Sequence, residues 1–236
     1  MCNTKCSYEV QLQDNKIPPL TVKQLEAGYI FFDECAFLHW RGLLDHWIEN
    51  IIKFCESDRG VNPYKDNEMC NVGLLEAAAW MSGGIAISEH RIKLIDGKWG
   101  RLDLWMKLPE FEKIELIEAK HTTNLALPKK NKAPDKYDYN FLKKDLDHRA
   151  DNIKYYFDEA KERKVVLLFL TFNSTDKKIF LNKTINDSPE DKIKHILKTI
   201  NGETLYNNGW QLTAWCFPKD MRKHDHPGII MSAKSI

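Results

Sequence analysis

Two largely apolar segments of this chain carry ionisable residues, among them Asp103, Glu118 and Lys120. Asp103 belongs to residues 100–105, and Glu118 and Lys120 belong to residues 114–120. Because side chains alternate across a strand, Glu118 and Lys120 should project from one face. A carboxylate and an ammonium group are costly to bury unless they are paired or bind a metal. Together the three residues suggest the chemistry of a metal-dependent phosphodiester hydrolase.

The elements that must position these residues are a helix, three strands, a second helix and a buried strand. Apolar spacing predicts the first helix over 68–81, and Gly83-Gly84 ends it. Asp96-Gly97 is a hairpin signal between the first two strands. The continuous apolar run 165–170 is typical of a strand buried on both faces. The three strands are expected over 85–92, 101–108 and 113–121, and the second helix over 140–163.

Outside residues 68–172, apolar spacing predicts fewer elements. Residues 1–30 are polar and predict an arm or a short hairpin, and helical spacing predicts a long amphipathic helix over 32–55. After the buried strand we expect a short strand near 179–181, a helix from 188 and a strand around 210–215.

Asp103, followed by Glu118-Ala119-Lys120 in this order of elements, resembles the PD-(D/E)XK nuclease superfamily over about residues 68–172. Leu102 stands where the family name has proline, a variable position in that superfamily. The resemblance implies an α/β, restriction-endonuclease-like αβββαβ core with a mixed central sheet flanked by helices, an N-terminal helix, and C-terminal strand and helix additions. The expected organisation is an N-terminal arm and packing helix (1–67), the nuclease core (68–172) and a C-terminal extension of the same domain (173–236).

Hydrolysis of a phosphodiester needs a hydroxide at neutral pH and neutralisation of charge in the transition state. A divalent ion held by carboxylates supplies both, and hard oxygen ligands favour Mg²⁺ or Mn²⁺. We therefore expect Asp103 and Glu118 to be metal ligands, and the resemblance implies a third oxygen from the Ala119 carbonyl. Lys120 would orient the attacking water or stabilise negative charge. The alternative is a buried ion pair with a structural role only.

Glu76 is a further catalytic candidate, because many members of this superfamily place an acidic residue on the helix before the first strand. Its neighbours are apolar, although a helix-surface glutamate explains it equally well. Glu89 on the first strand competes for the same role.

Basic residues follow the third strand and are interleaved with aromatic residues. They could contact a phosphate backbone and stack on bases, although a solvated loop explains most such runs. The candidates for nucleic-acid binding are Lys129, Lys130, Lys132, Lys143 and Lys144.

The chain has 236 residues and a formal net charge of +1, so affinity for nucleic acid must come from a local patch. No apolar run is long enough to cross a bilayer, the N-terminus lacks a signal peptide, and the six cysteines have no regular spacing. We therefore expect a cytosolic protein without a membrane partner.

The leading hypothesis is a Mg²⁺-dependent endonuclease acting on DNA, with direct attack by water and a 5′-phosphate product implied by the resemblance. Analogy favours prokaryotic defence, with a helicase or another protein as partner, and the oligomeric state stays open. One rival is an RNase on the same scaffold. The other is an inactive nuclease-like protein that binds a protein or nucleic acid.

Overall fold

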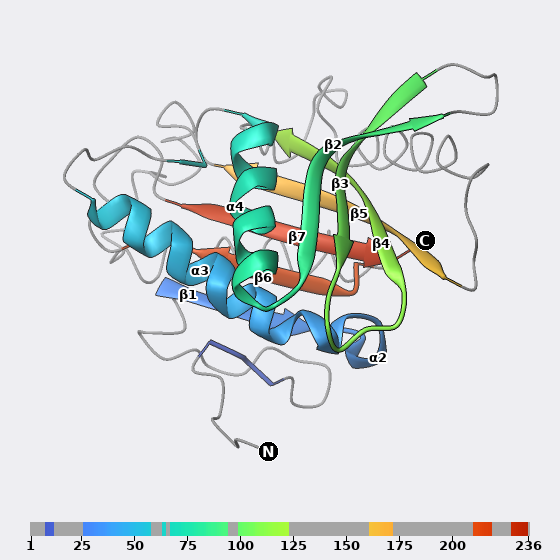
Figure 1. The fold of residues 1–236 in the computed structure, drawn as a ribbon. Helices are drawn as coiled ribbons and strands as arrows, with labels where there is room; N and C mark the ends of the chain where they lie inside the picture. Colours follow the sequence, from blue (N-terminus) through green and yellow to red (C-terminus); the bar gives the residue numbers. More distant parts are fainter. Residues whose placement is uncertain are drawn as a thin grey trace, which may run out of the picture.

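The computed structural model describes residues 8–11, 26–57, 63–64, 67–93, 99–122, 161–171, 210–218 and 228–235. One mixed sheet of seven strands runs through this part of the chain, in the order β1-β6-β7-β5-β4-β3-β2 (Figure 1). β4 and β5 are parallel, and the other neighbours are antiparallel. The strands are β1 (Ala27–Phe31), β2 (Ile85–Lys93), β3 (Trp99–Lys107), β4 (Ile114–Thr122), β5 (Glu162–Thr171), β6 (Leu212–Cys216) and β7 (Ile229–Ser235).

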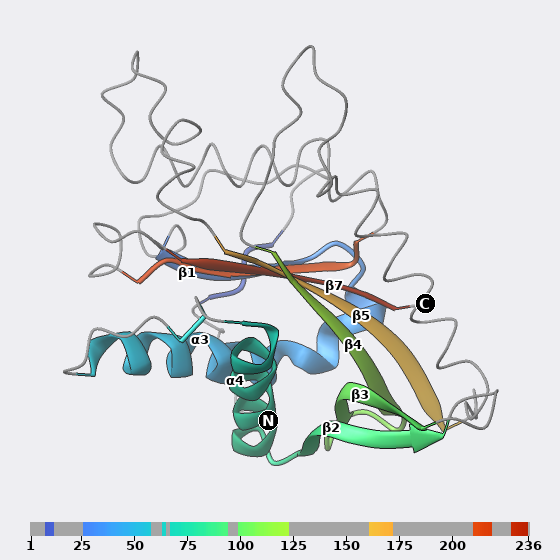
Figure 2. The same ribbon diagram turned by 90° about the horizontal axis from the view of Figure 1, so that it is seen from above.

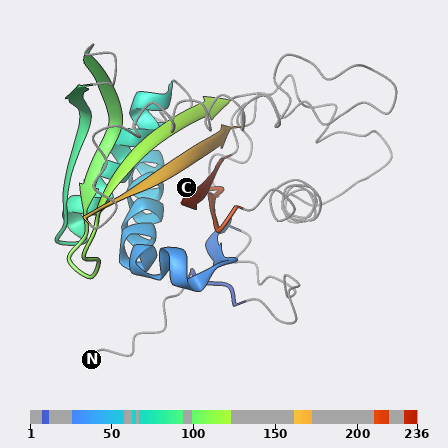
Figure 3. The same cartoon turned by 90° about the vertical axis from the view of Figure 1, so that its right-hand side faces the viewer.

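The described helices α3 (Arg41–Glu56) and α4 (Glu68–Met81) cover one face of this sheet (Figure 2). α3 is preceded by the short helix α2 (Glu34–Phe37) and the 3-10 turn η1 (Leu38–Trp40). The sheet twists strongly, and β2 and β3 turn toward the side on which α4 lies (Figures 2 and 3). An α/β fold with a mixed sheet and packed helices is therefore confirmed.

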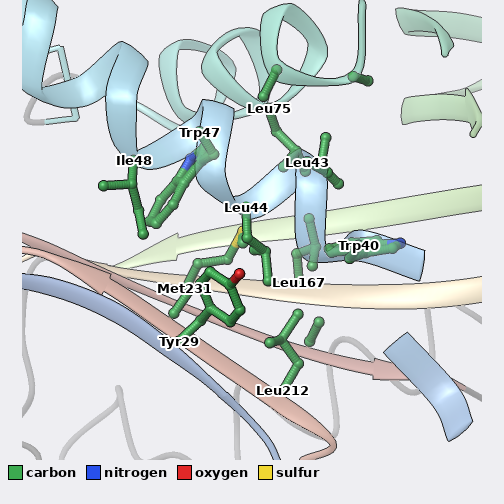
Figure 4. Close-up of a cluster of buried hydrophobic side chains, with 14 of the residues drawn as sticks. Tyr29, Trp40, Leu43, Leu44, Trp47, Ile48, Leu75, Leu167, Leu212 and Met231 are labelled. Atoms are coloured by element: carbon green, nitrogen blue, oxygen red, sulfur yellow. The ribbon is translucent and has the colours of Figure 1, made fainter. Parts of the chain in front are cut away.

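The core lies between α3, α4 and the sheet. Most apolar residues of α3 recur at the spacing of one helix face, which points inward. They meet side chains from β1, β5, β6 and β7 (Figure 4). Fully buried members include Leu44, Trp47, Ile48, Leu167 and Met231.

Several predicted elements are confirmed. α4 covers the predicted residues 68–81, with the Asn67 side chain accepting a hydrogen bond from the Cys70 amide at its start. Gly83 follows it with a φ of 78°, a conformation that favours glycine. The strands predicted over 85–92, 101–108 and 113–121 are β2, β3 and β4, and β5 is buried along 164–171 as the apolar run indicated.

Three predictions need correction. The helix expected over 32–55 begins at Glu34 and is interrupted by η1, which turns the Trp40 indole toward Glu115. The second helix cannot reach residue 163, because β5 begins at Glu162. The arm expected over residues 1–30 contributes β1, and β7 was not predicted at all.

The remaining predictions for residues 123–160 and 172–209 lie outside the described residues. None of the described helices combines the length and apolar character that crossing a bilayer requires.

Candidate active site

The Glu118-Ala119-Lys120 segment lies where β3 and β4 separate. β4 pairs with β5 along its whole length, but with β3 only at Glu115, Leu116 and Ile117. Continued in the same register, residues 99–103 of β3 would face residues 118–122 of β4, and this pairing is not made. β3 instead stays with β2 as far as Trp99, and Figure 1 shows the two strands diverging from β4.

Asp103 occupies the first position after the strands separate. In the continued register its partner would be Glu118, a pairing that is not made. Its carboxylate Oδ2 accepts a hydrogen bond of 2.7 Å from the Ala119 amide. The Asp103 carboxylate thus replaces the β3 backbone carbonyl that would accept a hydrogen bond from this amide if the two strands stayed paired.

Glu68 accepts a hydrogen bond from the amide of His121, two residues further along the same edge of β4. It is the first residue of α4, and its Oε2 accepts a hydrogen bond of 3.1 Å from the His121 amide. The same oxygen lies 3.9 Å from Lys120 Nζ. Two carboxylates from different elements therefore line the edge of β4 that β3 has left.

The Ala119 carbonyl faces the same opening. The N–H and C=O groups of one strand residue point to the same side, because such residues exchange both bonds with one partner. Since the Ala119 amide points to Asp103, its carbonyl oxygen also faces the gap between β3 and β4.

A small cavity adjoins this opening, between α4 and strands β2 and β3. Its volume is about 40 Å³, which is room for about three water molecules. Three of its lining residues are acidic, one each from α4, β2 and β3. The lining consists of Glu68, Met69, Val72, Ser88, Glu89 and Asp103.

Glu89 interrupts the edge strand at this cavity. It has a φ of 55° and is missing from the β2–β3 pairing at the position opposite Asp103. Left-handed backbone at a residue other than glycine costs of order 1–3 kcal/mol and is common near functional sites. Its carboxylate forms an ion pair with Arg101.

The other predicted residues are placed differently. Glu118 is 7% exposed and is not among the described residues that line the cavity. Glu76 accepts a long hydrogen bond of 3.4 Å from the Ser88 amide. It lies eight residues beyond Glu68, roughly 12 Å along the helix axis. The five candidate lysines (Lys129, Lys130, Lys132, Lys143 and Lys144) lie outside the described residues.

The donor set at the opening suits a hard divalent cation, since it consists of carboxylate and carbonyl oxygens. Within the described residues, no three His, Cys, Asp or Glu side chains converge closely enough to hold an ion by themselves. An ion bound there through Asp103 and the Ala119 carbonyl would therefore keep several waters, as Mg²⁺ usually does.

Glu68 is the residue that the sequence reading missed. An acidic residue directly after an N-cap is favourable for the helix on its own, so its type and position carried no functional signal. Only the packing of the first turn of α4 against the end of β4 brings it to Lys120.

The start of β4 is held by a second charge cluster, centred on the fully buried Glu115. Glu115 accepts hydrogen bonds from Trp40 Nε1 at 2.7 Å, from His39 Nε2 at 3.1 Å and from Arg163. The Arg163 guanidinium lies between the rings of Phe37 and Phe111, at 4.6 and 4.7 Å from their centroids. This cluster joins α2, η1, β4 and β5 three residues before Glu118 and so fixes where the candidate site begins.

Comparison with known protein families, curated proteins and solved structures finds no match to this chain.

Proposed function

We propose that this protein is a Mg²⁺- or Mn²⁺-dependent nuclease that hydrolyses phosphodiester bonds of DNA, with a restriction-endonuclease-like core. The observation that carries the proposal is the Asp103 carboxylate bound to the Ala119 amide where β3 leaves β4. It brings the Asp103 carboxylate to the backbone of Ala119, the residue between Glu118 and Lys120.

Each group has a distinct role in this proposal. Asp103, Glu118 and the Ala119 carbonyl supply ligands, and the bound ion would activate a water molecule and neutralise the phosphate. Lys120 stabilises the negative charge that develops on the phosphate oxygens. Glu68 positions Lys120, because its carboxylate lies 3.9 Å from the ammonium group and is itself held by the His121 amide.

A second candidate function has its own supporting observation. Asp103 and Glu68 each accept a backbone amide hydrogen bond, which is a sufficient structural reason for both carboxylates. In that case the protein would be an inactive nuclease-like fold that binds a protein or nucleic acid.

The test is cleavage of labelled DNA and RNA by the full chain, with Mg²⁺, with Mn²⁺ and with a chelator. We expect DNA to be cut only when a metal is present, and Lys120→Ala to abolish cutting. Lys53→Ala is the matched control, because this lysine is exposed on α3 and pairs only with Glu49 among the described contacts. Cleavage of RNA alone would favour the RNase, and full activity of Lys120→Ala would refute the proposed site.

A further inference from the structure

The outer face of α4 is apolar although it is exposed. Met69, Trp80 and Met81 have exposed fractions of 64%, 53% and 46%. Cys70 and Ala77 are also exposed, so none of the exposed residues of this fully described helix carries a charge. The two charged residues of α4, Glu68 and Glu76, are half-buried. An exposed apolar surface of this kind is typical of a site that packs against another molecule.

Gly73 lies in the middle of this face without a structural reason inside the chain. A Cβ added at Gly73 would meet nothing within 4 Å, whereas one at Gly84 would lie 2.8 Å from the Lys107 carbonyl oxygen. Glycine inside a helix costs about 1 kcal/mol relative to alanine. A small residue at this position therefore makes sense if another backbone approaches α4 there.

The exposed residues and the half-buried Gly73 are arranged symmetrically about position 75. Met69 corresponds to Met81, Cys70 to Trp80 and Gly73 to Ala77. A two-fold symmetric interface needs such self-complementarity, because residue i meets residue j and residue j meets residue i. Two antiparallel copies of α4 would thus place small residues together at the centre and large residues at both ends.

The Trp80 side chain is held in one orientation by a contact within the chain. Its indole Nε1 donates a hydrogen bond of 3.0 Å to the Ala86 carbonyl oxygen, which fixes the ring while leaving half of it exposed. Rigid, exposed tryptophans of this kind commonly anchor protein interfaces. Ile85 and Ile87, exposed on the neighbouring strand β2, extend the apolar surface.

We propose that this face of α4 is the contact surface of a two-fold symmetric dimer of the chain. Nucleic acid fits the face poorly, because α4 contains no Lys or Arg to neutralise phosphates. The proposal does not depend on nuclease activity.

Light scattering during size exclusion tests it. The wild-type chain should have twice its 27.6 kDa mass, and Gly73→Glu should have the single mass because each new carboxylate would be buried against Ala77 of the other copy without a partner. Gly73→Glu should keep the circular-dichroism spectrum of the wild type, which would show that it folds, because a Cβ at this helical position meets nothing within 4 Å. Gly42→Glu on α3 is the matched control, because a Cβ there also meets nothing within 4 Å, and it should stay dimeric.

A cross-link tests the register. Met69→Cys combined with Met81→Cys should give a covalent dimer on oxidation, beyond any formed by the wild-type cysteines. Within one chain these positions are roughly 18 Å apart along the helix, too far for a disulfide. A wild-type monomer, a dimeric Gly73→Glu variant, or no such cross-link would overturn the proposal.

Discussion

Asp103 allows the structural and the catalytic roles of one carboxylate to be separated. Its Oδ2 accepts the Ala119 amide at 2.7 Å, and Ala119 is fully buried. Asp103→Ala removes the acceptor and leaves a buried N–H group without that partner. A hydrogen bond to a charged group contributes about 1.5–3 kcal/mol, so we expect a loss of about that size in the free energy of unfolding.

Asp103→Asn keeps an oxygen at the same position and removes only the negative charge. Hydrogen bonds between neutral groups are roughly half as strong as charge-assisted ones, so this variant should lose only about 1 kcal/mol. In a chain of this size, each kcal/mol corresponds to roughly 2–4 °C in Tm. The asparagine variant should therefore unfold at a clearly higher temperature than the alanine variant.

Activity should not follow that order. If Asp103 supplies the charge that holds the metal, both variants should lose cleavage by on the order of 100-fold or more, as is typical of groups that stabilise a transition state electrostatically. Thermal unfolding and initial rates of DNA cleavage on the same preparations give both quantities. An asparagine variant that cuts DNA at the wild-type rate would refute a metal-binding role and leave only the hydrogen bond.

The remaining predictions concern the charges around β4 and the buried thiol of α3. Glu115→Gln should lower the free energy of unfolding by about 3–5 kcal/mol in urea, because Arg163 would keep a buried charge without its carboxylate. Replacing both residues by apolar ones of similar size should restore only part of that stability, because Trp40 Nε1 and His39 Nε2 would still lose their acceptor. A double variant as unstable as Glu115→Gln would contradict this. Glu68→Gln should reduce DNA cleavage with a change of less than about 1 kcal/mol in stability, because it loses a partly exposed pairing with Lys120. Burial raises the pKa of the Cys55 thiol from 9.0 to about 11, so between these pH values the folded chain keeps a proton that the unfolded chain has released. Stability should therefore fall as pH rises from 9 to 11, and Cys55→Ala should show a smaller fall in urea titrations; an equal fall would show that other groups cause it.

The elements that could be predicted from the sequence are those whose signals are local. α4 has a side-chain cap at one end and glycines at the other, and β5 is a continuous apolar run, so both were found with little error. Asp103, Glu118 and Lys120 were conspicuous because a charge inside an apolar strand is unusual. Each of these signals can be read within about fifteen residues of chain.

What could not be predicted depends on contacts between distant residues. β1 is a short strand that pairs with the distant β6, and β7 lies between β6 and β5, so both strands depend on partners elsewhere in the chain. The role of Glu68 depends on α4 packing against the end of β4, 53 residues away. The interruption of the first helix at η1 depends likewise on Trp40 reaching Glu115 across 75 residues.

The separation of β3 from β4 is the strongest argument that this edge has a purpose. β3 and β4 are nine residues long and share a register that would pair them to their ends, so the gap is not caused by a lack of residues. Each backbone hydrogen bond that they forgo would contribute about 0.5–1.5 kcal/mol. The chain instead brings Asp103 and Glu68 to the amides of Ala119 and His121 on this edge and accepts left-handed backbone at Glu89. Stability alone would favour the closed ladder, so the open one is better explained by a site that needs acidic groups and a backbone carbonyl at one point.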